Sequence, residues 1–386
     1  MSDATPSGQE FESSLKDASQ TVAQFDDDRK GLVSRIQHFL HGNPSMVPFV
    51  VLVLSTIGLG IYIDWEPIMV RMGWARLEDV SNGSFRFFSP FTLTLILQQV
   101  QIVGVLALAQ TLIILTAGID LSVGAIAVLC SVIMGKLTFS YGVPPAISLA
   151  LGLAFGTAIG AVSGFLVSRV KLPPFIVTLG MWQIVLAANY LYSANETIRS
   201  QDIEAQAPFL QFLGTSYKIF ADENGRGGAT FTLGVISMIL LACILAYALR
   251  STAWGRHVYA VGDDPEAAEL AGVNVHRTLM SVYMLAGLIC AFTAWVMIGR
   301  FGSISPSAST GVLGNIQAIT AVVIGGISLF GGRGSILGAL FGALIVGVFE
   351  LGLRMAGADA QWTYLLIGVL IIAAVSVDQW IRKVSA

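Results

Sequence analysis

Uncharged polar side chains recur at helical spacing inside long apolar runs of this 386-residue chain. Gln99 and Gln110 are eleven residues apart, or three helical turns, so they share one face of a helix. Thr178, Trp182 and Asn189 form a second stripe with the same periodicity. Amide, hydroxyl and indole groups suit a neutral, hydroxyl-rich solute, but the same groups also bond and pack between helices. The spacing leaves a solute path and ordinary helix packing as alternatives.

Acidic residues are few at these apolar runs. Asp120, Glu350 and Asp378 lie within or beside them, and ionisable groups at membrane depth are candidate functional residues. Each also has a structural interpretation, since Asp120 can cap the helix that follows it, Glu350 can pair with Arg354 four residues on, and Asp378 lies near a helix end. The residues that we take as candidates for a substrate path are Gln99, Gln110, Asp120, Ser122, Thr178, Trp182 and Asn189.

The sequence shows no evident catalytic site. The glycine cluster 331–334 lacks the lysine and the preceding strand of a phosphate-binding loop, so we expect no ATP hydrolysis by this chain. Its four histidines and three cysteines show no metal-ligand spacing. We therefore expect a chain that is not an enzyme and that binds no metal or cofactor of its own.

The composition is that of a membrane protein. Hydrophobic residues make up 55% of the chain and charged residues 12%, about half the ~25% of soluble domains. The net charge is −3 and the mean hydropathy +0.75. A water-soluble enzyme and a nucleic-acid binder are excluded, since the former needs a polar surface and the latter a basic face.

Ten apolar runs follow a polar tail. Glycines four residues apart, as at Gly152, Gly156 and Gly160, predict close helix packing. Residues 1–45 form a tail without a cleavable signal, in which 29–41 is either an amphipathic helix or frayed. We expect one all-α domain over 46–384 with about ten transmembrane helices, at 46–63, 91–116, 121–140, 145–167, 175–193, 230–249, 279–299, 316–330, 336–354 and 363–381.

An even number of spans places both termini on one side of the membrane. The short loops on that side, 168–174, 250–278 and 331–335, carry six arginines and lysines, whereas the opposite short loops carry only Arg300. By the positive-inside rule both termini are expected in the cytoplasm, although the longer loops 64–90 and 194–229 also hold basic residues.

The loop 250–278 contains complete start and stop signals for a short helix. Asp264 can cap it, Pro265 suits the first helical position, Glu266 lies in the first turn and Gly272 follows the last turn. A mere connector needs no such definite structure, so we expect a helix that docks onto another protein.

Four motifs occur in order along the chain. They are Thr116–Gly124, Pro174–Met181, Thr252–Arg256 with Ala260–Ala268, and Ala321–Ser335. Each resembles a signature of the ribose/xylose/galactose-type permeases of bacterial ABC importers, and the resemblance covers about 46–384.

The resemblance implies an inner-membrane permease that dimerises and receives a monosaccharide from a periplasmic binding protein. It also implies docking of a P-loop ATPase subunit, which uses the ATP, on the loop 252–273. The residues that the resemblance assigns to this coupling are Trp254, Gly255, Arg256, Asp264, Pro265, Glu266, Ala267, Ala268 and Gly272.

One block departs from the family pattern. Many members have Glu-Leu-Asp where this chain has Asn315-Ile316-Gln317, which we expect near an outer helix end. This block and the long tail are most similar to fructose-type members, so fructose is the expected sugar, with ribose, mannose or xylose as alternatives. A stand-alone secondary transporter or channel for a small neutral solute is the alternative function, but it leaves the capped helix after Asp264 unexplained.

Overall fold

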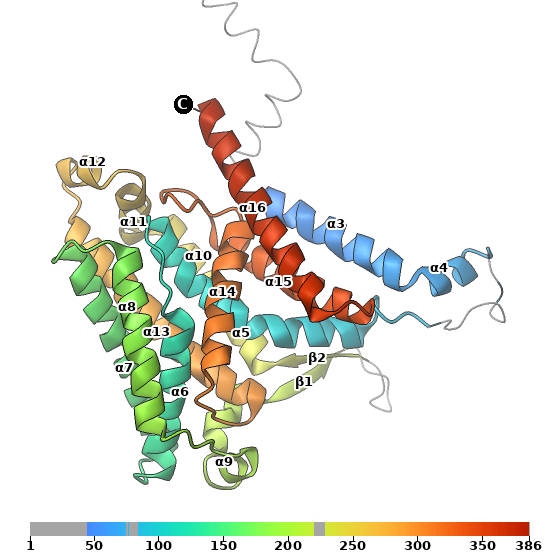
Figure 1. Ribbon diagram of the computed structural model, residues 1–386, viewed down its shortest axis with the longest axis horizontal. Helices are drawn as coiled ribbons and strands as arrows, with labels where there is room; N and C mark the ends of the chain where they lie inside the picture. The colour runs from blue at the N-terminus through green and yellow to red at the C-terminus, as the bar shows by residue number, and fades with distance from the viewer. Residues whose placement is uncertain (1–44, 75, 77–83, 220–227, 386) are drawn as a thin grey trace, which may run out of the picture.

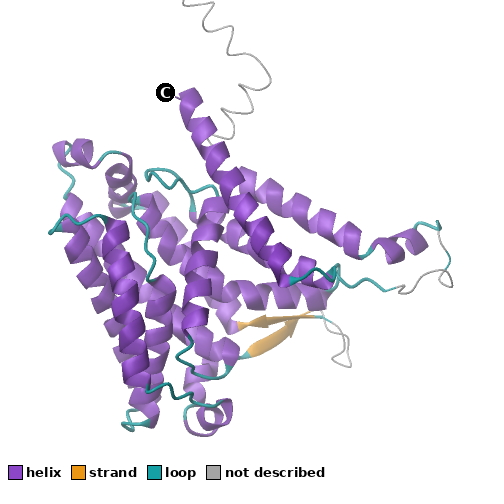
Figure 2. Cartoon of the chain, in the orientation of Figure 1, coloured by secondary structure: helices purple, strands orange, loops and turns teal. Residues whose placement is uncertain are grey.

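The computed structural model describes residues 45–74, 76, 84–219 and 228–385, and the predicted amphipathic helix at 29–41 lies outside them. The described chain is almost entirely helical (Figures 1 and 2). Its one sheet is an antiparallel hairpin of β1 (Ser216–Ile219) and β2 (Ala229–Thr232), in which Ser216 pairs with Thr232. An all-α membrane fold is thereby confirmed.

A helix overlaps each of the ten predicted apolar runs. Seven of the described helices are long and apolar enough to cross a membrane by length and composition, and the apolar stretches of α6, α14 and α16 are shorter. The ten helices are α3 (Met46–Ile63), α5 (Pro90–Leu115), α6 (Val123–Phe139), α7 (Pro145–Ser168), α8 (Pro174–Ser193), α10 (Leu233–Ser251), α13 (Val275–Phe301), α14 (Ala308–Ile324), α15 (Ile336–Met355) and α16 (Ala360–Ser385).

Because the helices alternate in direction, their connections gather at two opposite faces (Figure 1). The α12 face carries the loops 116–122, 169–173 and 325–335, together with α11 (Ala253–Asp263) and α12 (Pro265–Leu270). The hairpin face carries α4 (Trp65–Arg71), α9 (Ser200–Gln206), the 3-10 helix η3 (Pro208–Gly214) and the β1–β2 hairpin. Helix α3 starts and helix α16 ends at the α12 face.

The position of α14 differs from the predicted one. We expected a span over 316–330, but the helix runs from Ala308 to Ile324 and residues 325–335 form a loop. Gly311 and Gly314 make the first half of α14 resemble a loop in the sequence. In the structure they allow close packing: a Cβ at Gly311 would lie 3.4 Å from the Ala125 backbone of α6, and one at Gly314 would lie 3.0 Å from the Leu106 side chain of α5. Asn315 to Gln317 therefore lie in the middle of a helix, not near an outer helix end.

Glycines bring α7 and α13 into backbone contact. A Cβ added at Gly156 would lie 2.7 Å from the carbonyl oxygen of Gly287, and one at Gly160 would overlap the carbonyl oxygen of Tyr283. Since lipid provides no hydrophobic drive for helix association, this close approach is what holds the pair together. The predicted glycine-rich packing is confirmed at this contact.

We predict that Gly160→Leu prevents correct folding. The added side chain cannot enter the α7–α13 contact without separating the helices, which costs at least about 1–3 kcal/mol. Fluorescence-detected size-exclusion chromatography of a GFP fusion in mild detergent measures the loss of the monodisperse peak. Gly58→Leu on α3 is the control, because nothing lies within 4 Å of a Cβ at that position. Equal profiles for the two variants would contradict the packing role.

Candidate translocation and coupling sites

A non-helical segment that starts at the α12 face separates α5 from α6; we call it the break. Residues 116–122 are not helical, and Ala117 adopts a left-handed conformation with φ of 59°. Thr116, Asp120 and Ser122 are buried. Backbone N–H and C=O groups in such a place need hydrogen-bond partners, because an unsatisfied group costs several kcal/mol in an apolar environment.

Side chains from two neighbouring helices supply part of these partners. The buried Gln110 amide of α5, oriented to satisfy both bonds, donates to the carbonyl oxygen of Asp120 (3.0 Å) and accepts from its N–H (3.2 Å). The hydroxyl of Thr178, on α8, donates to the carbonyl oxygen of Ile119 at 2.9 Å. Both side chains thus hold the backbone of the break.

Asp120 forms hydrogen bonds within the break itself. Its Oδ1 accepts from the N–H of Ser122 (2.6 Å) and from the Ser122 hydroxyl (2.5 Å). Helix α6 starts at Val123 with Ser122 as its N-cap residue, so Asp120 does not occupy the cap position that was one of its two interpretations. The carboxylate stabilises the turn that precedes the helix.

Asn315 completes this arrangement, although it was not among the predicted site residues. Its Oδ1 accepts from the N–H of Gly124 and its Nδ2 donates to the carbonyl oxygen of Leu121, both at 2.5 Å. Asn315 lies on α14, more than 190 residues further along the chain. The signal in the sequence was an amide beside an apolar run, but the neighbouring residues give no indication of its hydrogen-bond partners.

The structure thus brings together four of the predicted path residues, Gln110, Asp120, Ser122 and Thr178. Asn189 lies further along α8, where its Nδ2 donates to the carbonyl oxygen of Pro306 at 3.0 Å. Trp182 and Asn189 border a narrow cleft beside α6 and α14. Gln99 is half-buried on α5, three turns from Gln110.

At the α12 face, the predicted short helix is present as α12. The carboxylate of Asp264 accepts from the N–H groups of Glu266 (2.9 Å) and Ala267 (3.0 Å), with Pro265 at the first position. Gly272 follows with φ of +85°, a conformation that favours glycine. Of these residues Asp264, Pro265, Glu266 and Ala267 are exposed, whereas Ala268 is buried.

Helix α11 precedes α12 and was not predicted. It buries Gly255, Val258 and Val261 on one face, and that spacing in the sequence was the available signal. The indole Nε1 of Trp254 donates to the Ser281 hydroxyl of α13 at 2.8 Å. Trp254 and Gly255 therefore fix α11 to the membrane helices, while Arg256 is exposed.

Backbone contacts join α11 to the break. Gly262, at the end of α11, lies so close to the Leu115 carbonyl oxygen that a Cβ would overlap it, and that oxygen accepts from the N–H of Gly332 at 3.0 Å. The Tyr259 hydroxyl donates to the carbonyl oxygen of Gly334 at 2.9 Å. Burial raises the pKa of Tyr259, which keeps this donor protonated. Three segments distant in sequence thus meet where α5 ends.

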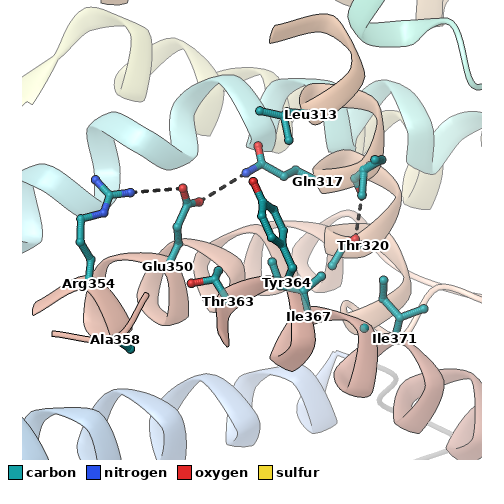
Figure 3. Close-up of a pocket in the computed structure, with 12 residues that line it drawn as sticks. Leu313, Gln317, Thr320, Glu350, Arg354, Ala358, Thr363, Tyr364, Ile367 and Ile371 are labelled. Atoms are coloured by element: carbon teal, nitrogen blue, oxygen red, sulfur yellow. Dashed lines mark hydrogen bonds and ion pairs between the residues drawn. The ribbon is translucent and has the colours of Figure 1, made fainter. Parts of the chain in front are cut away.

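A pocket of about 400 Å³ lies between α14, α15 and α16 (Figure 3). Glu350 accepts from Arg354 (3.3 Å) and from the Gln317 amide (3.3 Å), so the predicted pairing of Glu350 with Arg354 is confirmed. This pocket was not predicted, since its polar residues come from three different helices.

These features define a polytopic membrane protein: a bundle of apolar helices, a hydrogen-bonded break between two of them and an exposed capped helix on one face. Residues 92–375 match the family described as the permease component of a branched-chain amino acid transport system, and the chain belongs to this family.

Named relatives resemble the chain over most of its length. It is 62% identical to the fructose import permease protein FrcC of Rhizobium meliloti, over 99% of this chain and 98% of that protein. It is 36% identical to the ribose import permease protein RbsC of Bacillus subtilis (84% and 96%) and 32% identical to the galactose/methyl galactoside import permease protein MglC of Escherichia coli (76% and 87%). No solved structure is significantly similar.

We predict that Thr178→Val destabilises the protein and lowers transport. The variant leaves the Ile119 carbonyl oxygen without this donor, at a cost of about 1 kcal/mol or more. Thr157→Val is the matched control, because the Thr157 hydroxyl bonds only the Leu153 carbonyl oxygen of its own helix. Thermal unfolding in detergent should show a lower midpoint for Thr178→Val alone, and equal midpoints would argue against a role in holding the break.

Proposed function

We propose that this chain is the permease subunit of an ATP-binding-cassette importer that carries a monosaccharide into the cytoplasm, with fructose as the principal substrate. The similarity to a fructose import permease over the whole chain supports both the class and the sugar. The ribose and galactose permeases are similar at roughly half that identity, so they support the class more than the sugar.

The observation that carries the proposal is α12, a helix of six residues that is capped at its start and projects from the α12 face. Its Leu270 side chain is 91% exposed, and Glu266 and Glu269 are exposed beside it. An apolar side chain on a rigid, short element is a suitable anchor for a groove in a partner protein. We infer that the partner is a P-loop ATPase subunit and that the α12 face lies in the cytoplasm.

The contacts of α11 connect the docking helix α12 to the end of α5. A displacement of α12 by the ATPase moves α11, and the backbone contact at Gly262 passes the movement to the end of α5. The break at 116–122 is the adjacent non-helical segment, where the chain can change direction without breaking helical hydrogen bonds. In the proposed importer a second copy of this chain completes the path, and a periplasmic sugar-binding protein docks on the hairpin face.

Uptake of labelled fructose by cells without other fructose transport tests the function. The three subunits expressed together should give uptake that disappears when the ATPase subunit carries an inactive phosphate-binding lysine. Uptake that instead persists without the ATPase and follows a proton or sodium gradient would overturn the proposal and support a stand-alone transporter.

We predict that Leu270→Asp abolishes co-purification of the ATPase subunit and therefore uptake, because a charge replaces the apolar anchor. Leu191→Asp is the matched control: Leu191 is 84% exposed but lies near the hairpin-face end of α8. Affinity purification in mild detergent, with the ATPase quantified by immunoblot, measures the effect. Retention of the ATPase by the Leu270 variant would refute docking on α12.

We predict that Gly262→Ala leaves ATPase binding intact but strongly reduces uptake. The added methyl group must displace either α11 or the end of α5, because it would overlap the Leu115 carbonyl oxygen. Gly58→Ala is the control, with open space at its Cβ position. Normal uptake by the Gly262 variant would show that this contact does not transmit movement.

A further inference from the structure

The pocket between α14, α15 and α16 has the composition of a small-molecule site. Its walls are mainly apolar, and a few polar groups converge on its interior, as is typical of ligand pockets of 300–1,000 Å³. Figure 3 shows Tyr364 of α16 pointing toward Gln317, with Thr363 beside Glu350. The lining residues include Leu313, Ile316, Thr320, Ile367, Gly368 and Ile371.

The polar groups descend from the hairpin face into the bundle. Arg354 lies in the last turn of α15 with a side chain that is 64% exposed, whereas Glu350, one turn deeper, is 23% exposed. From Thr363 to Ile371 the pocket follows α16 for about 12 Å, more than a third of a hydrocarbon core of ~30 Å. The charged pair lies at the mouth of the pocket, within the last turns of α15, and the residues of α16 continue the pocket below it.

The charges in the pocket favour a neutral ligand. Glu350 and Arg354 neutralise one another through their 3.3 Å contact, and Gln317 adds an uncharged amide. Together they offer acceptors and donors within one small space, which matches hydroxyl groups that both donate and accept. The ring of Tyr364 and the surrounding isoleucines supply apolar surface for a carbon skeleton.

We propose that this pocket is a binding site for the transported sugar, a neutral polyol, on the hairpin-face side of its path. Gln317 and Glu350 bind the hydroxyl groups, Arg354 orients the Glu350 carboxylate, and Tyr364 packs against the sugar ring. The identity of the ligand rests on the proposed function, but its chemical class follows from the pocket alone.

Substrate protection of an introduced cysteine tests the site. The chain offers a close pair of positions in one loop: Ala358 lines this pocket, whereas Ala356 lines a separate pocket with Tyr62 and Asp64. Each is replaced by cysteine in a Cys243→Ala background, because Cys243 is the exposed one of the three native cysteines. The complete importer in membrane vesicles is labelled with an impermeant maleimide, with and without millimolar fructose.

Fructose should slow the labelling of Ala358→Cys severalfold and leave Ala356→Cys unchanged. Equal labelling rates at both positions with and without sugar, in an importer that still takes up fructose, would overturn the site while leaving the proposed function intact. Protection of Ala358→Cys by ribose or galactose and not by fructose would support the site and overturn the choice of sugar.

Transport kinetics provide a second readout. Gln317→Leu should raise the half-saturating fructose concentration roughly tenfold, as expected for one lost hydrogen bond to a ligand. Glu196→Gln is the control: it removes an ion pair with Lys136 at the same face, where the hydrogen bond from Lys136 lowers the pKa of Glu196. An unchanged half-saturation in the Gln317 variant would contradict its role in binding.

Discussion

The demand for hydrogen bonds by a buried, non-helical backbone determines much of this structure. The break at 116–122 exposes Ala117 at the α12 face but buries Thr116, Asp120 and Ser122, so the N–H and C=O groups around these residues need partners within the protein. Gln110, Thr178 and Asn315, from three different helices, bond its backbone. These three polar residues in an apolar sequence are therefore explained first by the hydrogen bonds that they make to the main chain, without any role in binding a solute.

Glycines make a second contribution to the packing, because they allow two backbones to come into contact where no side chain fits. Gly156 and Gly160 bring α7 against α13, and Gly262 brings α11 against the end of α5. The last contact places a helix of the α12 face directly on the segment that contains the break. A packed contact of this kind transmits displacement, since protein interiors are dense and deform little.

Features encoded locally could be predicted from the sequence, and those that depend on distant partners could not. Apolar run length gives the ten long helices, and the cap at Asp264 with Gly272 gives α12. The predicted limits of α14 were wrong because Gly311 packs against α6 and Gly314 against Leu106 of α5, and no local pattern reveals these contacts. Gln110 was predicted as a candidate for the substrate path, but the sequence alone could not show that both ends of its amide bond the Asp120 backbone.

Helix α14 connects the break with the pocket of Gln317 and Glu350. Asn315 and Gln317 are two residues apart, or about 200° around the helix, so they project to nearly opposite sides of it. Asn315 bonds the start of α6, whereas Gln317 bonds Glu350 in the pocket. Because one rigid helix carries both side chains, a movement of the break that pulls on Asn315 also shifts the wall of the pocket. Asn315 thus supports the backbone of the break on one side of α14, while Gln317 faces the pocket on the opposite side of the same helix.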